Sequence, residues 1–267
     1  MRVRSSLALL ALLAGCGGSS GPPDEVLAEL DALARGPNRM VAIASALVAS
    51  GSLFVPAPDD TLLTEIDARL GTETSGCATR ATVDGTISVD LHTAAGDPCV
   101  LQTGVVSLAG TMTIKIARAD PTIRIITMMD VTVDGEPLKG ELAIATTDGN
   151  VFSYTVLASL AGHEFDLRSF SAVPNGLAAV VGTSATTPGV GEAVRTLTYT
   201  NVAQRFSACH AHAGSLQLTS TMEGLDRTLT FADVTPQTGA AFYSEGSTTA
   251  SVTLPHLPSC PPLPQGS

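Results

Sequence analysis

Apolar residues recur every three or four positions between residues 24 and 70, which is the spacing that predicts amphipathic helices. The first helix is expected to end at Gly36-Pro37, because glycine and proline commonly terminate helices. A second helix is expected to begin at Pro37 and to end at Gly51, and a third is expected over 59–71. The pattern therefore predicts a short helical segment at the start of the folded body.

From about residue 78 the period of the apolar residues changes from 3.6 to 2, which is typical of strands with one buried face. The alternation is clear in TISVDL (86–91) and in the two runs that cover 106–117 and 122–133. Gly110 lies inside the second run, where we expect a bulge or a bend. The Asp-Gly pair at 134–135 indicates a tight hairpin turn.

No helical pattern alternates with these strands, which argues against a parallel sheet. We therefore expect a mainly β fold, an antiparallel meander of hairpins that forms a curved sheet, a barrel or a sandwich. The helical segment over 24–70 precedes this β domain, which is expected to cover 71–267 and to end in a proline-rich tail.

The N-terminus has the pattern of an export signal. Two arginines precede an apolar run over 7–14, which is too short for a membrane span of ~20 residues. The run ends in Leu13-Ala14-Gly15-Cys16, which resembles the lipobox of bacterial lipoproteins. This resemblance implies cleavage after Gly15, a diacylglyceryl group on the thiol of Cys16 and acylation of the new amino group. The alternative is an ordinary cleaved signal peptide with a chance cysteine.

The resemblance also implies where the protein is located and how its start is organised. Residues 1–15 would be the signal peptide, and residues 16–23, rich in glycine and serine, would be a flexible tether. Gly17 stands where some lipoproteins carry an aspartate that retains them in the inner membrane. We therefore expect a lipid-anchored protein of the bacterial cell envelope, at the outer membrane.

The body of the chain has a looser resemblance. The cysteines at 77 and 99, the strands TISVDL and TIKI (113–116) and the segment DVTVDGEPLKGEL (130–142) are similar to a set of uncharacterised β-rich bacterial lipoproteins. This resemblance rests on strand and turn pattern, and it implies no particular activity.

The charge of the chain restricts its partners. The formal net charge is −11, and removal of residues 1–15 with Arg2 and Arg4 takes it to about −13. Nucleic acid is disfavoured, because its binding depends on lysine and arginine. Anionic lipid headgroups are disfavoured for the same reason, so we expect the acyl groups on Cys16 to supply the membrane contact.

Four cysteines remain after Cys16, and an even number in an exported chain indicates disulfides. Three pairings are possible. We favour Cys77–Cys99 and Cys209–Cys260, in which each bond closes one local loop and the second attaches the tail to the body.

The segment FSACHAHAGS (206–215) contains the most suggestive cluster of side chains. On one strand His210 and His212 would point to the same face, an arrangement found in zinc and copper sites. A third ligand would have to come from His92, His163, His256 or an acid. The alternative is a pair of loop histidines beside Cys209, whose thiol we expect to be used in a disulfide.

Other chemistry has less support in the sequence. Asp130, Asp134 and Glu136 could offer oxygen ligands to calcium, but the full spacing of a calcium loop is missing. The chain has no nucleophile-elbow motif, no phosphate-binding glycine loop and no dinucleotide fingerprint. The sequence therefore identifies no cofactor and no catalytic residue, and it favours a protein that is not an enzyme.

Three functions remain as hypotheses. The default is a structural or surface-interaction lipoprotein. The first alternative is a carrier of lipid or another apolar ligand, which resembles bacterial carriers with a half-barrel and a helical lid in the order of its elements only. The second alternative is a metal-binding protein centred on His210 and His212.

Overall fold

The computed structural model describes residues 21–48, 57–102, 106–119, 122–147, 152–175, 178–205 and 208–255. Its helices are α1 (Asp24–Val48), α2 (Asp59–Glu73) and the short α3 (Thr235–Thr238). The predicted signal peptide, the lipobox cysteine Cys16, and His256 and Cys260 near the other end of the chain lie outside the described residues.

One antiparallel sheet of 14 strands makes up most of the described chain. Its order is β1-β2-β4-β5-β6-β7-β8-β9-β10-β11-β12-β13-β14, with β3 paired to β4 beside this path. The strands are β1 (Thr79–Val83), β2 (Thr86–Asp90), β3 (Cys99–Val100), β4 (Ser107–Ala119), β5 (Thr122–Val133), β6 (Glu136–Thr146), β7 (Phe152–Leu160), β8 (His163–Asn175), β9 (Ala178–Pro188), β10 (Val194–Arg205), β11 (Ala213–Ser220), β12 (Leu225–Thr230), β13 (Ala240–Glu245) and β14 (Thr248–Thr253). The predicted mainly β meander is confirmed, and it takes the form of an open curved sheet.

The alternating pattern of the sequence places one face of each long strand in the core. In β5, for example, Ile123, Ile125, Met129, Val131 and Val133 are buried, whereas Met128 and Asp130 between them are exposed. The turn that follows has Asp134 and Gly135 at φ values of 51° and 86°, as the Asp-Gly pair predicted.

Of the bulge or bend expected at Gly110, the bulge is absent, and that alternative was wrong. Gly110 pairs with Val131 within an uninterrupted ladder between β4 and β5. A Cβ atom at residue 110 would lie 2.8 Å from the Cα of Val131 and 2.4 Å from the carbonyl oxygen of Asp130. Glycine is therefore required at residue 110 because two backbones approach closely there and because its φ is 122°. It does not mark the extra residue of a bulge.

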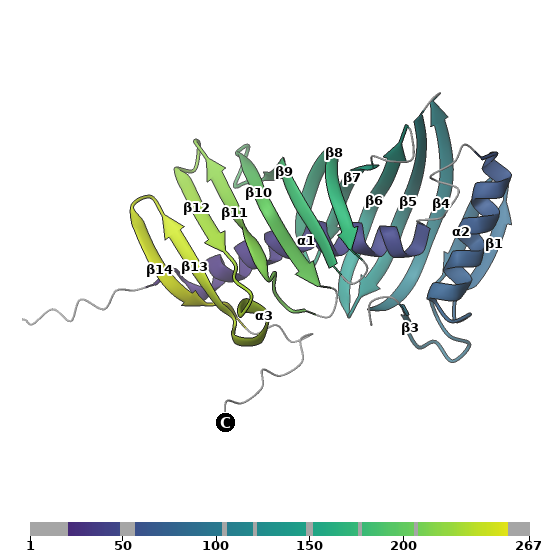
Figure 1. The fold of residues 1–267 in the computed structure, drawn as a ribbon, viewed down its shortest axis with the longest axis horizontal. Helices are drawn as coiled ribbons and strands as arrows, with labels where there is room; N and C mark the ends of the chain where they lie inside the picture. Colours follow the sequence, from purple (N-terminus) through teal and green to yellow (C-terminus); the bar gives the residue numbers. More distant parts are fainter. Residues whose placement is uncertain are drawn as a thin grey trace, which may run out of the picture.

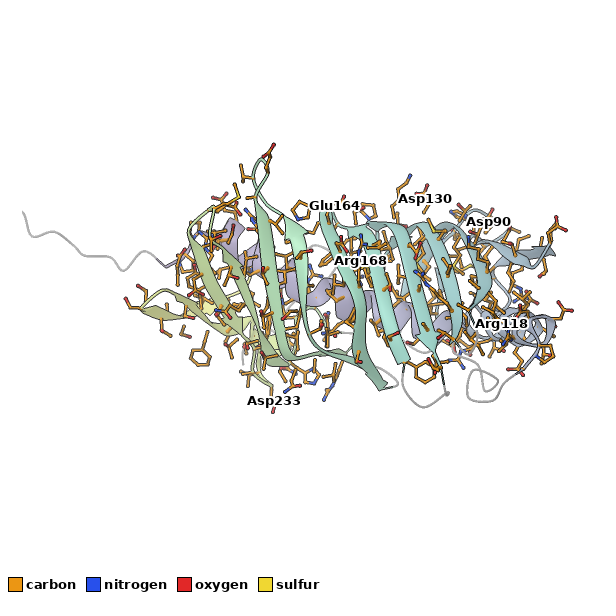
Figure 2. The ribbon with its side chains drawn as sticks, turned by 90° about the horizontal axis from the view of Figure 1, so that it is seen from above. Asp90, Arg118, Asp130, Glu164, Arg168 and Asp233 are labelled. Carbon is orange, nitrogen blue, oxygen red and sulfur yellow. A yellow bond between two sulfur atoms is a disulfide. The ribbon has the colours of Figure 1, made fainter. Side chains whose placement is uncertain are left out.

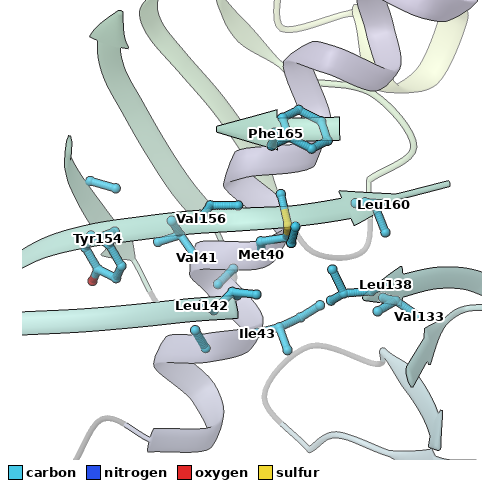
Figure 3. Packing of buried hydrophobic residues seen from close by; sticks show 14 of the residues in the cluster. Met40, Val41, Ile43, Val133, Leu138, Leu142, Tyr154, Val156, Leu160 and Phe165 are labelled. Carbon is cyan, nitrogen blue, oxygen red and sulfur yellow. The ribbon is translucent and has the colours of Figure 1, made fainter. Parts of the chain in front are cut away.

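Helix α1 lies along the inner face of the curved sheet and contacts every strand from β6 to β12 (Figure 1). Each residue from Leu33 to Val48 is buried, so the second half of the helix has no exposed side. Figure 3 shows Met40, Val41 and Ile43 packed among Val133, Leu138, Leu142, Tyr154, Val156, Leu160 and Phe165 of the sheet. The sheet therefore forms a trough, and α1 fills it.

The predicted end of the first helix at Gly36-Pro37 was also wrong, because α1 continues through both residues. Gly36 fits because the ring of Phe165 lies against it, and a Cβ atom there would be 2.3 Å from the Cζ of that ring. Pro37 has no N–H, so the carbonyl of Leu33 one turn earlier has no donor within the helix. The hydroxyl of Tyr199 on β10 donates to this carbonyl at 2.8 Å and replaces the missing bond.

Helix α2 closes the first end of the sheet, where it packs on α1, β2 and β4. The side chain of Arg69 donates to the carbonyl of Ala46 in α1 at 2.7 Å. The predicted disulfide between Cys77 and Cys99, whose Cα atoms are 5.7 Å apart, joins the chain just after α2 to β3. Helix α2 is thus attached to α1 by a hydrogen bond, and it is attached to the sheet by packing and by the disulfide that follows it.

We predict that the hydroxyl of Tyr199 matters for stability only because Pro37 interrupts the hydrogen bonds of α1. Tyr199→Phe leaves the buried Leu33 carbonyl without a donor and should lower the free energy of unfolding by about 1–3 kcal/mol. In a Pro37→Ala background residue 37 regains its N–H, so the same substitution should cost clearly less. Urea unfolding of the four proteins in this double-mutant cycle measures the coupling. An equal cost in both backgrounds would contradict the assignment.

Candidate functional site

Two rims border the trough, because an antiparallel meander places alternate turns at opposite strand ends. The hairpin rim consists of the turns at residues 134–135, 161–162, 189–193, 221–224 and 246–247. The opposite cysteine rim carries the β10–β11 connection with Cys209 and the β12–β13 connection with α3. Figure 2 shows Asp130 and Glu164 toward the hairpin rim and Asp233 on the opposite side of the sheet.

The buried helix α1 carries polar side chains that face these rims. Glu29 and Asp31 are two residues apart and therefore point to nearly opposite sides of the helix, about 200° apart. Glu29 reaches Arg195, whose strand begins at the hairpin rim, at 2.6 Å. Asp31 reaches His210 in the cysteine rim at 3.0 Å. The first turns of α1 thus bridge the trough from one rim to the other.

Asp31, Arg35 and His210 form a buried polar cluster, with side chains that are 1–7% exposed. One carboxylate oxygen of Asp31 lies 3.1 Å from the Nε of Arg35 and 3.0 Å from the Nδ1 of His210. Neither nitrogen reaches this oxygen with hydrogen-bond geometry, and the second oxygen of Asp31 has no hydrogen-bond partner. The cluster is therefore held by charge more than by directed hydrogen bonds, and Arg35 supplies the compensating charge that a buried carboxylate requires.

The neighbouring polar residues of α1 have partners on the sheet. The Nδ2 of Asn38 donates to the carbonyl of Val202 at 2.8 Å, where a bulge interrupts the pairing of β10 with β9 and β11. Arg39 donates to Glu136 at 2.5 Å and forms an ion pair with Asp134. These contacts occupy Asp134 and Glu136, and Asp130 pairs with Lys139. The three acids considered as calcium ligands are thus engaged with cations of the chain.

The structure separates the members of the Cys209–His212 cluster. Cys209 is disulfide-bonded; Cys260, its predicted partner, lies outside the described residues. His210 points to Asp31, as described above. His212 is partly buried, and its Nδ1 has no hydrogen-bond partner. Burial lowers the pKa of His212 and nearby Arg205 lowers it further, while Asp233 opposes them.

The third ligand expected for a metal at His210 and His212 does not come from the described part of the chain. His92 is hydrogen-bonded to Asp90 at 2.6 Å, His163 lies in the hairpin rim, and His256 is not described. Among the described residues no group of three or more histidines, cysteines or acids is placed to hold a metal ion. A metal site at the two histidines therefore stays a prediction.

A polar cleft of about 260 Å³ opens at the hairpin rim, beside the start of α1. It is lined by Glu29 and Leu33 of α1 and by Gly162, His163, Glu164, Thr187, Pro188 and Arg195 of the sheet. The hydroxyl of Thr187 donates to the carbonyl of Glu164 at 2.6 Å and joins β8 to β9 on one side of the cleft.

Arg195 is the central charge of this cleft. Its guanidinium is bound by Glu29 of α1 and, through two nitrogens at 2.8 Å each, by Glu223 in the β11–β12 hairpin. The hydrogen bonds from Arg195 lower the pKa of Glu223 from 4.5 to about 2. Burial lowers the pKa of His163, and the charge of Glu29 opposes that shift. The cleft thus places an imidazole with a lowered pKa and the carboxylates of Glu29 and Glu164 near a cation that is already neutralised.

Neither group of charged residues was predicted from the sequence. Asp31 and Arg35 have the i, i+4 spacing of a solvent-exposed ion pair, and Glu29 lies on a face that reads as polar. The available signal was that these charges interrupt an otherwise apolar helix. This signal indicates buried ion pairs only when the sheet is known to enclose the helix.

The pKa of Glu223 predicts how stability changes with pH. A folded-state pKa of about 2, below the ordinary 4.5, gives a contribution that is present above pH 4.5 and is lost as the pH falls through about 2. Glu223→Gln should therefore lower the urea midpoint at pH 7, and its difference from the wild type should shrink toward pH 2.

Glu192→Gln is the matched control, because Glu192 is an exposed acid in the neighbouring hairpin. It should change the midpoint little at either pH. A deficit of Glu223→Gln that stays constant from pH 7 to pH 2 would contradict the role of its carboxylate.

None of the helices in the described ranges is both long and apolar enough to cross a membrane. Comparison of the chain with protein-family models, with curated proteins and with solved structures gave no match.

Proposed function

We propose that the chain is an exported lipoprotein of the bacterial cell envelope that acts as a structural or surface-interaction protein. The lipobox-like Leu13-Ala14-Gly15-Cys16 supports the anchor, and the Gly/Ser-rich residues 17–20 support a tether between anchor and body. Both are features of the sequence, and they lie outside the described residues.

The observation that carries the proposal is that α1 fills the trough. A carrier with a half-barrel holds its apolar ligand on the inner face of the sheet. In this chain that space is taken by α1, whose residues from Leu33 to Val48 are all buried. The cleft beside the helix is lined mainly by charged and polar side chains, so it does not replace an apolar cavity.

The outer face of the sheet is the larger surface left for contacts. In β4 and β5 the residues that point away from α1 include Thr111, Thr113, Lys115 and Asp130, all of them exposed. A broad, mostly polar face suits contact with another macromolecule better than it suits the enclosure of a small molecule.

The lipid anchor has a direct test. Cys16→Ser removes the acceptor of the diacylglyceryl group, so the protein should move from the membrane fraction to the soluble fraction of the envelope. Ser20→Ala, in the same segment, should leave the protein with the membranes. Membrane association of Cys16→Ser equal to that of the wild type would refute the anchor.

The filled trough can be tested by native mass spectrometry of the chain expressed without residues 1–16. We expect the mass of the polypeptide alone, since α1 occupies the space for a ligand. A co-purified lipid would contradict this expectation and support the carrier. Bound zinc or copper that is lost in a His210→Ala, His212→Ala variant would support the metal-binding alternative.

A further inference from the structure

Two neighbouring turns of the hairpin rim expose large apolar side chains. Val190 and Val194 in the β9–β10 hairpin are 77% and 61% exposed, and Met222 in the β11–β12 turn is 73% exposed. They are among the most exposed large apolar side chains in the described part of the chain. Single exposed apolar residues are common, but three in two adjacent turns form a small projecting apolar surface.

Glu223 fixes these two turns to each other. One of its carboxylate oxygens accepts hydrogen bonds from the backbone N–H of Val190 at 3.2 Å and from the guanidinium of Arg195 at 2.8 Å. Met222 directly precedes Glu223, and Val194 directly precedes Arg195. The two turns that carry the apolar side chains are therefore joined through Glu223.

The same two turns are joined to the start of α1, because Arg195 also binds Glu29 at 2.6 Å. Glu29 lies five residues after Asp24, which is about 7.5 Å along a helix. Seven residues lie between Cys16 and Asp24, and the eight Cα–Cα steps from one to the other span at most about 28 Å when fully extended. A bilayer that holds the acyl groups of Cys16 is consequently within reach of the two hairpins.

We infer that Val190, Val194 and Met222 form the part of the folded body that rests on the lipid bilayer. This inference depends on the lipid anchor proposed above. The anchor keeps the hairpins at a high effective concentration near the membrane, so contacts of a few apolar side chains are sufficient to orient the body.

The charges around these side chains specify the kind of lipid surface. Residues 188–195 and 220–225 contain no lysine and no arginine other than Arg195, which Glu29 and Glu223 neutralise. The exposed acid Glu192 lies between the two valines. An anionic surface would be repelled, so the contact suits zwitterionic headgroups with apolar insertion between them.

The chain contains no tryptophan, which allows a specific fluorescence test. Val190→Trp and Met222→Trp each create a single reporter on the proposed surface. The matched control is Met128→Trp on β5, where the native side chain is 45% exposed on the outer face. Each chain, beginning at Cys16, is coupled through the Cys16 thiol to a maleimide lipid in phosphatidylcholine vesicles that carry brominated acyl chains.

Bromine quenches only those tryptophans that enter the apolar part of the bilayer. We expect the fluorescence at residues 190 and 222 to fall by about twofold or more relative to vesicles without bromine, with little change at residue 128. No quenching at 190 and 222 would overturn the inference. Equal quenching at all three positions would also overturn it, because the outer face would then lie on the lipid.

The chemical coupling separates this inference from the proposed anchor. Failure of Cys16→Ser to release the protein from membranes would refute lipidation, whereas the vesicle test reports the orientation of a body tethered at residue 16. Circular dichroism and urea midpoints equal to those of the parent chain establish that each tryptophan variant is folded.

Discussion

The docking of α1 in the curved sheet is the interaction on which the remaining structure depends. An open sheet of 14 strands would expose its apolar inner face to water, and the helix covers that face over β6 to β12. The helix in turn needs the sheet, because Pro37 deprives Leu33 of its hydrogen bond and Tyr199 supplies another. The sheet needs the helix to cover its apolar face, and the helix needs the sheet to supply a donor for its Leu33 carbonyl.

The polar residues of α1 explain how one helix finds a single position in a long apolar trough. Apolar packing by itself tolerates small shifts along the groove. Asn38 requires the carbonyl exposed by the β10 bulge, and Arg39 requires the acids of the β5–β6 turn. Asp31 and Arg35 bring buried charge that is stabilised only near each other and near His210. Burial of these polar residues costs stability, but it fixes the position of α1 along the sheet, as buried polar groups do in some helical assemblies.

The strands could be predicted from the sequence because their burial follows a local period of two. The alternation over 122–133 reappears as the buried and exposed faces of β5, and the Asp134-Gly135 turn follows it. The helix could not be predicted to pass through Gly36-Pro37, since the features that permit it are distant in sequence: the ring of Phe165 and the hydroxyl of Tyr199. The buried charges were missed for the same reason. The pair Asp31 and Arg35 has the spacing of a surface ion pair, and only the enclosing sheet places it in the core.

The two rims of the trough differ in the side chains that they carry, so the two edges of the folded body are not equivalent. The cysteine rim carries a disulfide-bonded cysteine and places the buried His210 beside Asp31 of α1, while Val234 of the same rim is exposed. The hairpin rim holds the start of α1 through Glu29 and projects valine and methionine side chains into solvent. Arg195 joins the start of α1 to the β9–β10 hairpin and to Glu223, so the first turns of the helix are held to this rim. With the lipid anchor proposed above, the membrane lies nearest the hairpin rim, and the outer face of the sheet, on which Thr111, Thr113 and Lys115 are exposed, remains available to a partner.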